Sequence, residues 1–380
     1  MFNTVQKITK THIFCCMLTL TILSISGFSS YADAKTPSKS KLSLSSNTGY
    51  DSNPFRFSDG LGAESAQYIE ARISGSYALN ENFFTFTKLD ARQYDNDSND
   101  ATSSIYTLGA GFKKRFKLEG QKMKFKSKLQ YGVRDKTYVS RTTGEIAESS
   151  NTYIGDRYDY TFWGLDSDLA WAPNTINIFT VNFDYLNRDY ENLNIPTLSN
   201  LDYSEYTLGV NWKHKFDKKH SLKTKIAHRL RDSDGKDGLA YNTWMGRLTY
   251  SIKASDSLGL SFIAQYDHRE DNKTGKDDNN KILGRLGLTY NLDKQSELNA
   301  SVIYSQYDYP NRGQISNDQD EELSEEKGFR YKIQYLRNIL SIKGLAVLTT
   351  LRYDDIKSDL STYQYDRSQV SVGVKYAFQL

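Results

Sequence analysis

Apolar and polar residues alternate with a period of two along most of this chain, from Lys41 to the C-terminus. No stretch of that region shows a sustained helical period, so the pattern predicts β-strands. The last segment is the clearest, because one of its faces consists only of apolar residues, namely Val370, Val372, Val374, Tyr376, Phe378 and Leu380. A strand face without charged residues is typical of a strand that contacts lipid.

About sixteen segments carry this alternation. Each has roughly 10–17 residues, and a tilted strand needs only about 9–11 residues to cross a membrane. The segments are 41–50, 66–79, 83–94, 104–116, 122–137, 157–172, 176–190, 203–216, 220–232, 241–254, 258–269, 280–292, 296–308, 328–337, 342–353 and 363–380.

The connections between these segments alternate in length. Short turns occur at 80–82, 173–174, 217–219, 255–257 and 293–295, and long polar loops occur at 51–65, 95–103, 138–156, 191–202, 233–240, 270–279, 309–327 and 354–362. Outer-membrane barrels have short turns on the periplasmic side and long loops on the outside. The sequence therefore predicts an all-β fold, a transmembrane antiparallel up-and-down β-barrel of about 16 strands with both termini in the periplasm.

Two soluble folds are the alternatives, a large β-sandwich and a β-solenoid. In both, the apolar strand faces would pack on an internal core. The opposite faces carry charges at many consecutive positions in this chain, which disfavours a sandwich, and one closed barrel removes all strand edges at once. A solenoid is disfavoured because the sequence contains no repeat of fixed period.

The composition agrees with a polar-lined barrel. Hydrophobic residues make up only 38% of the 380 residues, whereas Tyr (28) and Phe (18) are abundant. Lys and Arg together (49) nearly balance Asp and Glu (46), which excludes a polybasic nucleic-acid-binding protein.

The N-terminus has the features of a secretory signal peptide. Lys7 and Lys10 precede an apolar run, and Ala32-Asp33-Ala34 is a small-x-small cleavage signature. We therefore expect a signal peptide at 1–34, a short periplasmic tether at 35–40 and one barrel domain at 41–380. Both cysteines lie within the predicted signal peptide, so the mature chain is expected to contain no disulfide.

The residues between the apolar positions would face the lumen, and about sixteen strands leave a lumen wide enough for water. Basic residues on this face are Arg72, Lys88, Arg92, Lys124, Lys126, Lys128, Arg134, Lys213, Lys223, Lys225, Arg229, Arg231, Arg247, Arg285, Arg330, Lys332 and Arg352. Acidic residues on it are fewer, namely Glu70, Asp90, Asp166, Asp168, Asp184, Glu205 and Asp267. A basic, water-filled lumen attracts anions.

A simpler interpretation of the basic face is that each charge pairs with a neighbouring carboxylate and gives no selectivity. Aromatic residues also fall on the lumen face, namely Tyr68, Phe84, Phe86 and Tyr94. Their rings could stack on sugars, although packing against the wall is the simpler role for each of them.

One short motif follows the first predicted strand. It reads Asn47-Thr48-Gly49-Tyr50-Asp51-Ser52-Asn53-Pro54-Phe55-Arg56. Its key residues are Gly49, Asp51, Asn53, Pro54 and Arg56, and physically it is a strand end followed by a turn. The motif resembles the early G-x-D-(D/S)-N-P/L-x-R segment of the EpsL-like or VpsM-like barrel porins encoded in exopolysaccharide operons. The resemblance implies export of a polysaccharide, with a periplasmic polysaccharide-export protein beneath the barrel.

Catalysis is not expected. The histidines of the mature chain are His214, His220, His228 and His268, and none is placed to pair with a serine and an orienting acid. Asp95, Asp97, Asp100 and the acidic run at 318–326 could bind Ca²⁺. Such runs are more often solvated surface, so no metal site and no cofactor is expected.

The function favoured by these features is an outer-membrane channel that exports an exopolysaccharide. A basic lumen would suit an acidic polymer. The alternatives are a general anion-preferring diffusion porin, with small anions as cargo, and a surface adhesin or receptor that acts through its loops. Expected partners are outer-membrane lipid, lipopolysaccharide and the barrel-assembly machinery. Tyr376, Phe378 and Leu380 are expected to form the membrane-insertion signal.

Overall fold

The computed structural model describes residues 40–56, 65–95, 101–139, 148–149, 152–153, 156–191, 200–233, 240–275, 277–311, 325–359 and 363–379. Its strands are β1 (Lys41–Asp51), β2 (Ala66–Ala78), β3 (Phe83–Asp95), β4 (Ala101–Leu118), β5 (Gln121–Lys136), β6 (Glu148–Ser149), β7 (Thr152–Tyr153), β8 (Tyr160–Ala172), β9 (Asn177–Tyr190), β10 (Tyr203–Lys215), β11 (His220–Ser233), β12 (Tyr241–Lys253), β13 (Leu258–Asp271), β14 (Asn279–Asn291), β15 (Ser296–Asp308), β16 (Glu325–Asn338), β17 (Leu345–Ser358) and β18 (Tyr365–Gln379). The predicted signal peptide, the tether up to residue 39, Asp97, Asp100 and Leu380 lie outside the described residues.

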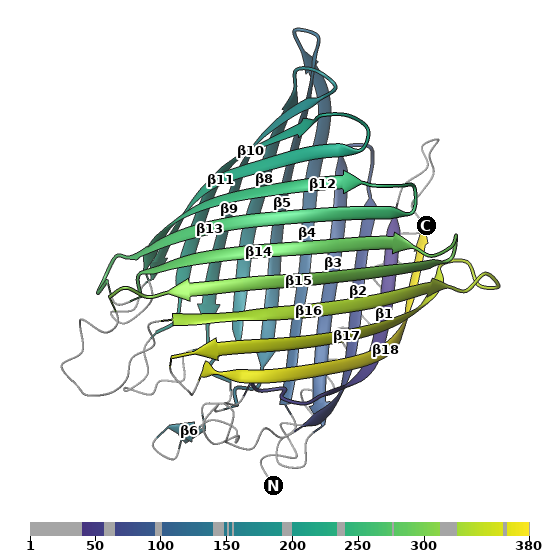
Figure 1. Ribbon diagram of the computed structural model, residues 1–380. Coiled ribbons are helices and arrows are strands. Elements are labelled where there is room, and N and C mark those ends of the chain that lie inside the picture. The colour runs from purple at the N-terminus through teal and green to yellow at the C-terminus, as the bar shows by residue number, and fades with distance from the viewer. Residues whose placement is uncertain are drawn as a thin grey trace.

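All strands except β6 and β7 form one closed barrel (Figure 1). Each barrel strand pairs antiparallel with the barrel strands before and after it in the chain, and β1 closes the barrel by pairing with β18. The 16-strand up-and-down barrel predicted from the sequence is thus confirmed. The short β6–β7 hairpin, inside the predicted loop 138–156, was not predicted.

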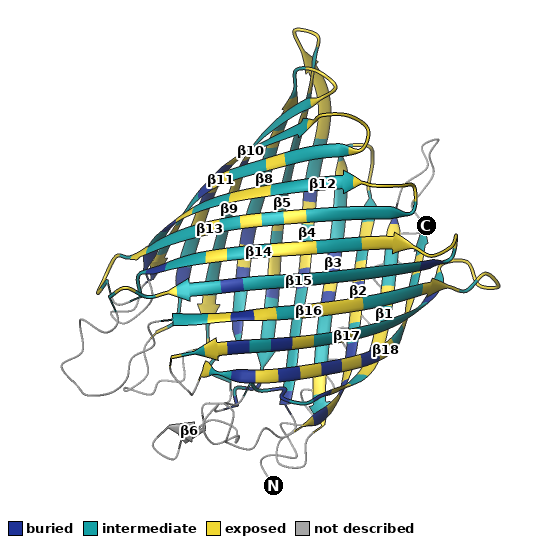
Figure 2. Cartoon of the chain, viewed as in Figure 1, coloured by how far each residue is buried: buried dark blue, intermediate teal, exposed yellow. Residues whose placement is uncertain are grey.

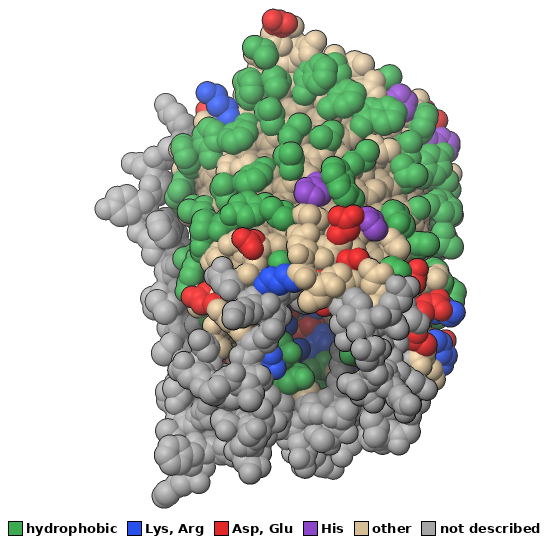
Figure 3. Space-filling model, turned by 90° about the vertical axis from the view of Figure 1, so that its left-hand side faces the viewer, with side chains coloured by type: hydrophobic (Ala, Val, Ile, Leu, Met, Phe, Trp, Pro, Cys, Tyr) green, Lys and Arg blue, Asp and Glu red, His purple; other side chains and the backbone are tan. Residues whose placement is uncertain are grey.

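The outer wall of the barrel consists of the apolar strand faces. Figure 2 shows exposed residues at intervals along β13 and β14, and Figure 3 shows hydrophobic side chains over much of the outer wall. The exposed apolar residues alternate along their strands, as in Leu129 and Tyr131 of β5 or Leu208 and Val210 of β10. A closed barrel with an apolar exterior can span a membrane, because every strand is paired and no backbone edge meets lipid.

The described residues include no helix that is long and apolar enough to cross a membrane.

The short turns share one hydrogen-bonding device. A side-chain oxygen of Asn80, Asn174, Asp217, Ser255 or Asp293 accepts hydrogen bonds from the backbone N–H groups two and three residues further on. Asn, Asp and Ser are suited to turns for this reason, since their side chains replace backbone partners. The turns predicted at these positions are confirmed.

The two ends of the barrel differ. Lys41 lies opposite Gln379, so both described termini lie at the end with the short turns, and Asp51 lies opposite Gln369 at the end with the long loops. In outer-membrane barrels the short-turn end faces the periplasm.

The β4–β5 hairpin extends beyond its neighbour β3 at the short-turn end (Figure 1). Phe83, the first residue of β3, lies opposite Phe112, whereas β4 and β5 stay paired as far as Leu118 and Gln121.

Candidate functional site

The candidate site is the inner wall of the barrel. Its residues are identified by register, because the side chains between the exposed apolar ones point to the opposite face. Ile226 of β11 is 64% exposed on the outer wall, which places its neighbours Lys225 and Ala227 on the inner wall. The same rule places all the predicted lumen residues on the inner wall: Arg72, Lys88, Arg92, Lys124, Lys126, Lys128, Arg134, Lys213, Lys223, Lys225, Arg229, Arg231, Arg247, Arg285, Arg330, Lys332 and Arg352.

Several basic residues of the inner wall lie directly opposite one another on paired strands. The opposed pairs are Lys113 and Lys126, Arg115 and Lys124, Lys117 and Lys122, Lys213 and Lys223, Lys225 and Arg247, and Lys332 and Arg352. Like charges at opposed positions of a sheet are destabilising, so stability does not account for this arrangement.

Lys113, Arg115 and Lys117 were missed by the sequence analysis, although they occupy the inner-wall parity of β4. Together with Lys122, Lys124 and Lys126 they make the inner face of the β4–β5 hairpin basic. We call this group of six residues the hairpin basic cluster. The period-two rule could have found its β4 members, because Phe112 and Phe116 alternate with them.

Carboxylates neutralise part of the inner wall. Glu70 accepts from Arg72 at 2.7 Å and from Arg92 at 2.6 Å. The other ion pairs of the described inner wall are Arg72 with Asp90, Lys128 with Asp166, Arg229 and Arg231 with Glu205, Arg352 with Asp354, and Arg367 with Asp51. Among the described residues, no carboxylate forms an ion pair with Lys88, Lys124, Lys126, Lys223, Lys225, Arg247, Arg285, Arg330 or Lys332. The wall is therefore only partly paired.

Figure 3 shows charged side chains inside a hollow on the side of the molecule that faces its viewer.

A cavity of about 360 Å³ lies along β13 to β16, and its lining includes Arg285, Lys332, Gln334 and Asn299. Two of these lining residues are basic groups without an ion pair to a described residue.

The aromatic residues predicted on the inner wall pack against it. The Phe86 and Phe84 rings lie over Gly109 and Gly111, where an added Cβ would clash with them. Tyr68 and Tyr94 both contact the guanidinium of Arg92, at 4.7 and 5.8 Å from their ring centroids. These contacts fit the simpler interpretation of wall packing.

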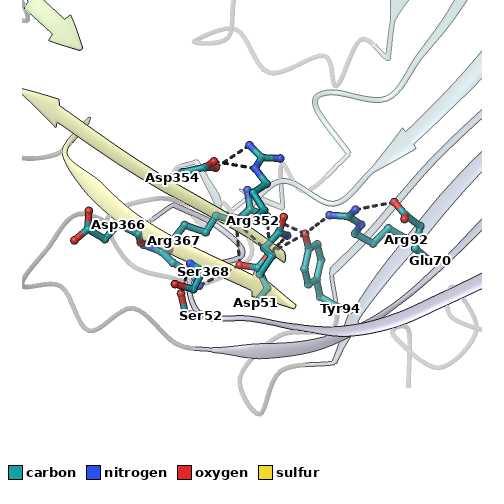
Figure 4. A network of polar contacts seen from close by, with 12 residues as sticks. Asp51, Ser52, Glu70, Arg92, Tyr94, Arg352, Asp354, Asp366, Arg367 and Ser368 are labelled. Carbon is teal, nitrogen blue, oxygen red and sulfur yellow. Dashed lines mark hydrogen bonds and ion pairs between the residues drawn. The ribbon is translucent and has the colours of Figure 1, made fainter. Parts of the chain in front are cut away.

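The motif after the first strand closes the barrel at its long-loop end (Figure 4). Asp51 is fully buried and forms an ion pair with Arg367, whose Nε donates to Oδ1 at 2.9 Å. Asn53 donates from Nδ2 to the Asp366 carbonyl at 3.2 Å. This ion pair could not be predicted from local patterns, because its partners are separated by most of the chain.

Other motif residues support the same seam between β1 and β18. Gly49 lies so close to the Val370 carbonyl oxygen and the Tyr68 ring that a side chain would clash. The guanidinium carbon of Arg56 lies 5.9 Å from the Tyr365 ring centroid. Pro54 lies in the turn that follows β1. These contacts point to a structural role for the motif. Tyr376 and Phe378 lie on the outer wall of β18 with their ring centroids 5.2 Å apart.

The histidines form no catalytic arrangement with described residues. His220 contacts Asp217 in a short turn, His214 contacts Asn177, and His268 contacts Asn280. The His228 ring packs against the Trp244 ring in a tilted arrangement, with a centroid distance of 4.6 Å. Three carboxylates that were not predicted as a group, Asp156, Asp159 and Glu191, lie near one another at the long-loop end. Exposed acidic groups of this kind are common without a metal.

The fold and its inner wall define a transmembrane β-barrel of porin-like architecture. No family model and no curated protein matches the chain. Among solved structures, it is similar to one titled a bacterial polysaccharide outer membrane secretin, with 8% identity over 91% of this chain and 100% of that chain and a TM-score of 0.49. It is also similar to OccAB3 of Acinetobacter baumannii (10% identity, 90% and 99% covered, TM-score 0.47) and to OpdQ of Pseudomonas aeruginosa (14% identity, 90% and 98% covered, TM-score 0.43).

These values describe a likeness of fold alone. The function of this chain is therefore inferred from its own side chains.

Proposed function

We propose that the chain forms an outer-membrane channel that prefers anions. The observation that carries this proposal is the set of opposed basic pairs on the inner wall, such as Lys113 with Lys126 and Lys225 with Arg247. Each pair weakens the sheet that holds it. Attraction of anions gives such pairs a function, because the fields of two neighbouring charges on the wall add in the water of the lumen.

The test is the reversal potential of the purified mature barrel in planar bilayers under a salt gradient. The variant Lys126→Gln removes one inner-wall charge, and the triple variant with Lys124, Lys126 and Lys128 changed to Gln removes three. The matched control is Lys114→Gln, which removes the same charge from the outer parity of β4.

We expect anion-preferring currents in the wild type, a reduced preference in Lys126→Gln and a larger reduction in the triple variant. Lys114→Gln should stay close to the wild type. Equal effects of Lys126→Gln and Lys114→Gln would contradict the proposal, because net charge and not the inner wall would then set the preference. A barrel that carries no current would favour the adhesin or receptor function.

Export of an acidic polysaccharide is the second candidate function. It is favoured by the hairpin basic cluster, which continues the basic wall beyond the first residue of β3, toward the expected periplasmic side. A long polyanion can contact such a surface before it enters the lumen, whereas a small ion has no need of it. The resemblance of the Gly49–Arg56 motif points the same way and would add a periplasmic polysaccharide-export protein as partner.

This second function is tested by adding polygalacturonate, an acidic polysaccharide, to the short-turn side of the channel. We expect it to interrupt the current from that side, and neutral dextran of the same size to have no such effect. Arg115→Gln together with Lys122→Gln should shorten the interruptions. Equal interruption by dextran, or from both sides, would leave the small-anion channel as the function.

A further inference from the structure

Arginine and tyrosine alternate around one side of the barrel at its long-loop end. The guanidinium carbon of Arg188 lies 4.6 Å from the Tyr160 ring centroid and 5.3 Å from that of Tyr203. Arg231 lies 3.8 Å from Tyr203 and 4.6 Å from Tyr241. At the two ends, Arg134 lies 5.5 Å from Tyr160 and Arg269 lies 4.2 Å from Tyr241. We call these seven residues the arginine–tyrosine ladder.

The ladder follows from the strand register. Arg134, Arg188, Arg231 and Arg269 lie near the ends of β5, β9, β11 and β13, and the tyrosines lie at the starts of β8, β10 and β12. Arg134 lies opposite Tyr160, Arg188 opposite Tyr203, and Arg231 opposite Tyr241. Consecutive arginines are therefore always two strands apart.

Stacking on a ring occupies the flat face of a guanidinium and leaves the N–H groups at its edge available. The three tyrosines are buried, with exposed fractions of 5%, 6% and 3%, and so form a fixed support. Arg231 donates from Nε and Nη2 to Glu205, and Arg134 donates from one Nη atom to the Tyr160 hydroxyl at 3.4 Å. No described carboxylate pairs with Arg134, Arg188 or Arg269. The Nε atoms of Arg188 and Arg269 are buried and have no hydrogen-bond partner among the described residues.

On the opposite side of the barrel, buried carboxylates neutralise the arginines at the long-loop end. There, Arg92, Arg352 and Arg367 form ion pairs with Glu70, Asp354 and Asp51, which are all buried (Figure 4). Arg92, Arg352 and Arg367 are each held by a carboxylate, Arg92 by the Tyr68 and Tyr94 rings as well, whereas three of the four arginines of the ladder contact rings and pair with no described carboxylate. The ladder thus keeps its capacity to bind an anion.

We propose that the arginine–tyrosine ladder is a binding site for molecules that carry two or more carboxylates. The fork of a guanidinium matches a carboxylate with two parallel hydrogen bonds. Each ring centroid lies within 5.5 Å of the arginines on both sides. Consecutive guanidinium carbons are therefore no more than about 11 Å apart, in agreement with two strand spacings of about 4.8 Å each.

The spacing selects the ligand. A dicarboxylate long enough to reach two consecutive arginines gains a second bidentate contact, whereas one with adjacent carboxylates does not. This inference rests on the proposed function, since it names the class of anion that the channel would take.

The experiment is a calorimetric titration of the purified full-length barrel in detergent with sebacate, a long straight-chain dicarboxylate. Malonate, whose carboxylates are adjacent, and acetate are the comparison ligands. Arg188→Gln removes one fork, Arg188→Lys keeps its charge without the fork, and Tyr203→Leu removes a support without changing the charge. Lys375→Gln, on β18 near the short-turn end, is the control for net charge.

We expect saturable binding of sebacate that is tighter than binding of malonate. Affinity should fall by about tenfold or more in Arg188→Gln, because a charged hydrogen-bonded contact is lost. Arg188→Lys and Tyr203→Leu should both weaken binding by several-fold, and Lys375→Gln by less than about twofold. Heat-dependent gel mobility verifies that each variant is a folded barrel.

The inference is overturned if wild-type protein does not bind sebacate, or if Arg188→Gln and Lys375→Gln weaken binding equally. Reversal potentials on the same preparations separate the two proposals. Anion preference without sebacate binding rejects only the ladder site, and sebacate binding without anion preference rejects only the anion-preferring channel.

Discussion

Asp51, the last residue of β1, and Arg367, near the start of β18, form a buried ion pair that joins the first strand of the barrel to the last. The Arg367 side chain is 5% exposed and the Asp51 side chain is not exposed at all. Gln369 and the Asn53 backbone N–H also donate to the Asp51 carboxylate, so the charge is well hydrogen-bonded. The barrel is therefore closed at the long-loop end by side chains as well as by strand pairing.

Removing one charge of this pair should destabilise the barrel strongly. Asp51→Asn leaves the buried Arg367 charge without its carboxylate partner, which costs about 3–5 kcal/mol of unfolding free energy. Urea unfolding of the barrel in detergent measures the loss. Asp355→Asn is the control, because its ion pair with Lys357 is partly exposed and is worth about 1 kcal/mol or less. Similar losses in both variants would show that Asp51 has no special role.

The alternation of apolar and polar residues was sufficient to predict the strands, because it is a local property of each segment. The turns were predictable for the same reason, since residues such as Asn80 and Asp293 act within a few positions of themselves. The Asp51–Arg367 pair and the stacking of Arg188 on Tyr203 were not predicted. Both depend on which residues face each other across strands, and period two alone does not give that register.

A charge reversal in the hairpin basic cluster should raise stability and lower anion preference together. Lys113→Glu places a carboxylate opposite Lys126 and replaces a repulsive pair by an attractive one. The gain in unfolding free energy should be about 0.2–1 kcal/mol. Urea unfolding measures the gain, and reversal potentials measure the preference.

The control for this variant is Lys114→Glu, which makes the same charge change on the outer parity of β4. It should lower the anion preference much less than Lys113→Glu does. A Lys113→Glu barrel that keeps the full wild-type preference would show that the hairpin contributes nothing to selectivity.

The turn between β10 and β11 should contribute to the acid sensitivity of the barrel. The His220 side chain and the backbone N–H groups of His220 and Lys219 hydrogen-bond to Asp217 and lower its pKa from 3.8 to about 2. A carboxyl group with a lower pKa in the folded state stabilises the fold above its unfolded pKa, and this contribution is lost as the pH falls through the folded one. Wild-type melting temperature should therefore fall between about pH 4 and about pH 2.

Asp217→Asn keeps the acceptor oxygen of the turn and removes the charge, so its melting temperature should depend less on pH in this window. Circular dichroism melts across the window measure the difference. Glu119→Gln, which removes an exposed carboxylate from the β4–β5 turn, is the control and should behave as the wild type. An unchanged pH dependence in Asp217→Asn would assign the acid sensitivity to other groups.

Two glycines of the barrel wall should respond oppositely to the same substitution. A Cβ at Gly132 of β5 would clash with the Phe162 ring and lie 2.5 Å from the Tyr106 carbonyl oxygen, whereas no atom of the described residues lies within 4 Å of a Cβ at Gly284 of β14. Gly132→Ala should therefore cost about 1–3 kcal/mol of unfolding free energy. Gly284→Ala should add about 0.5–1 kcal/mol, because alanine loses less backbone entropy on folding.

Urea unfolding of both single variants tests this pair of predictions, and Phe162→Leu identifies the cause. If the ring is what resists the new methyl group, Phe162→Leu combined with Gly132→Ala should be more stable than the sum of the two single effects. Strict additivity would instead assign the cost to the Tyr106 carbonyl, which belongs to the paired backbone of β4 and cannot move away. A Gly132→Ala barrel as stable as the wild type would contradict the close packing of this part of the inner wall.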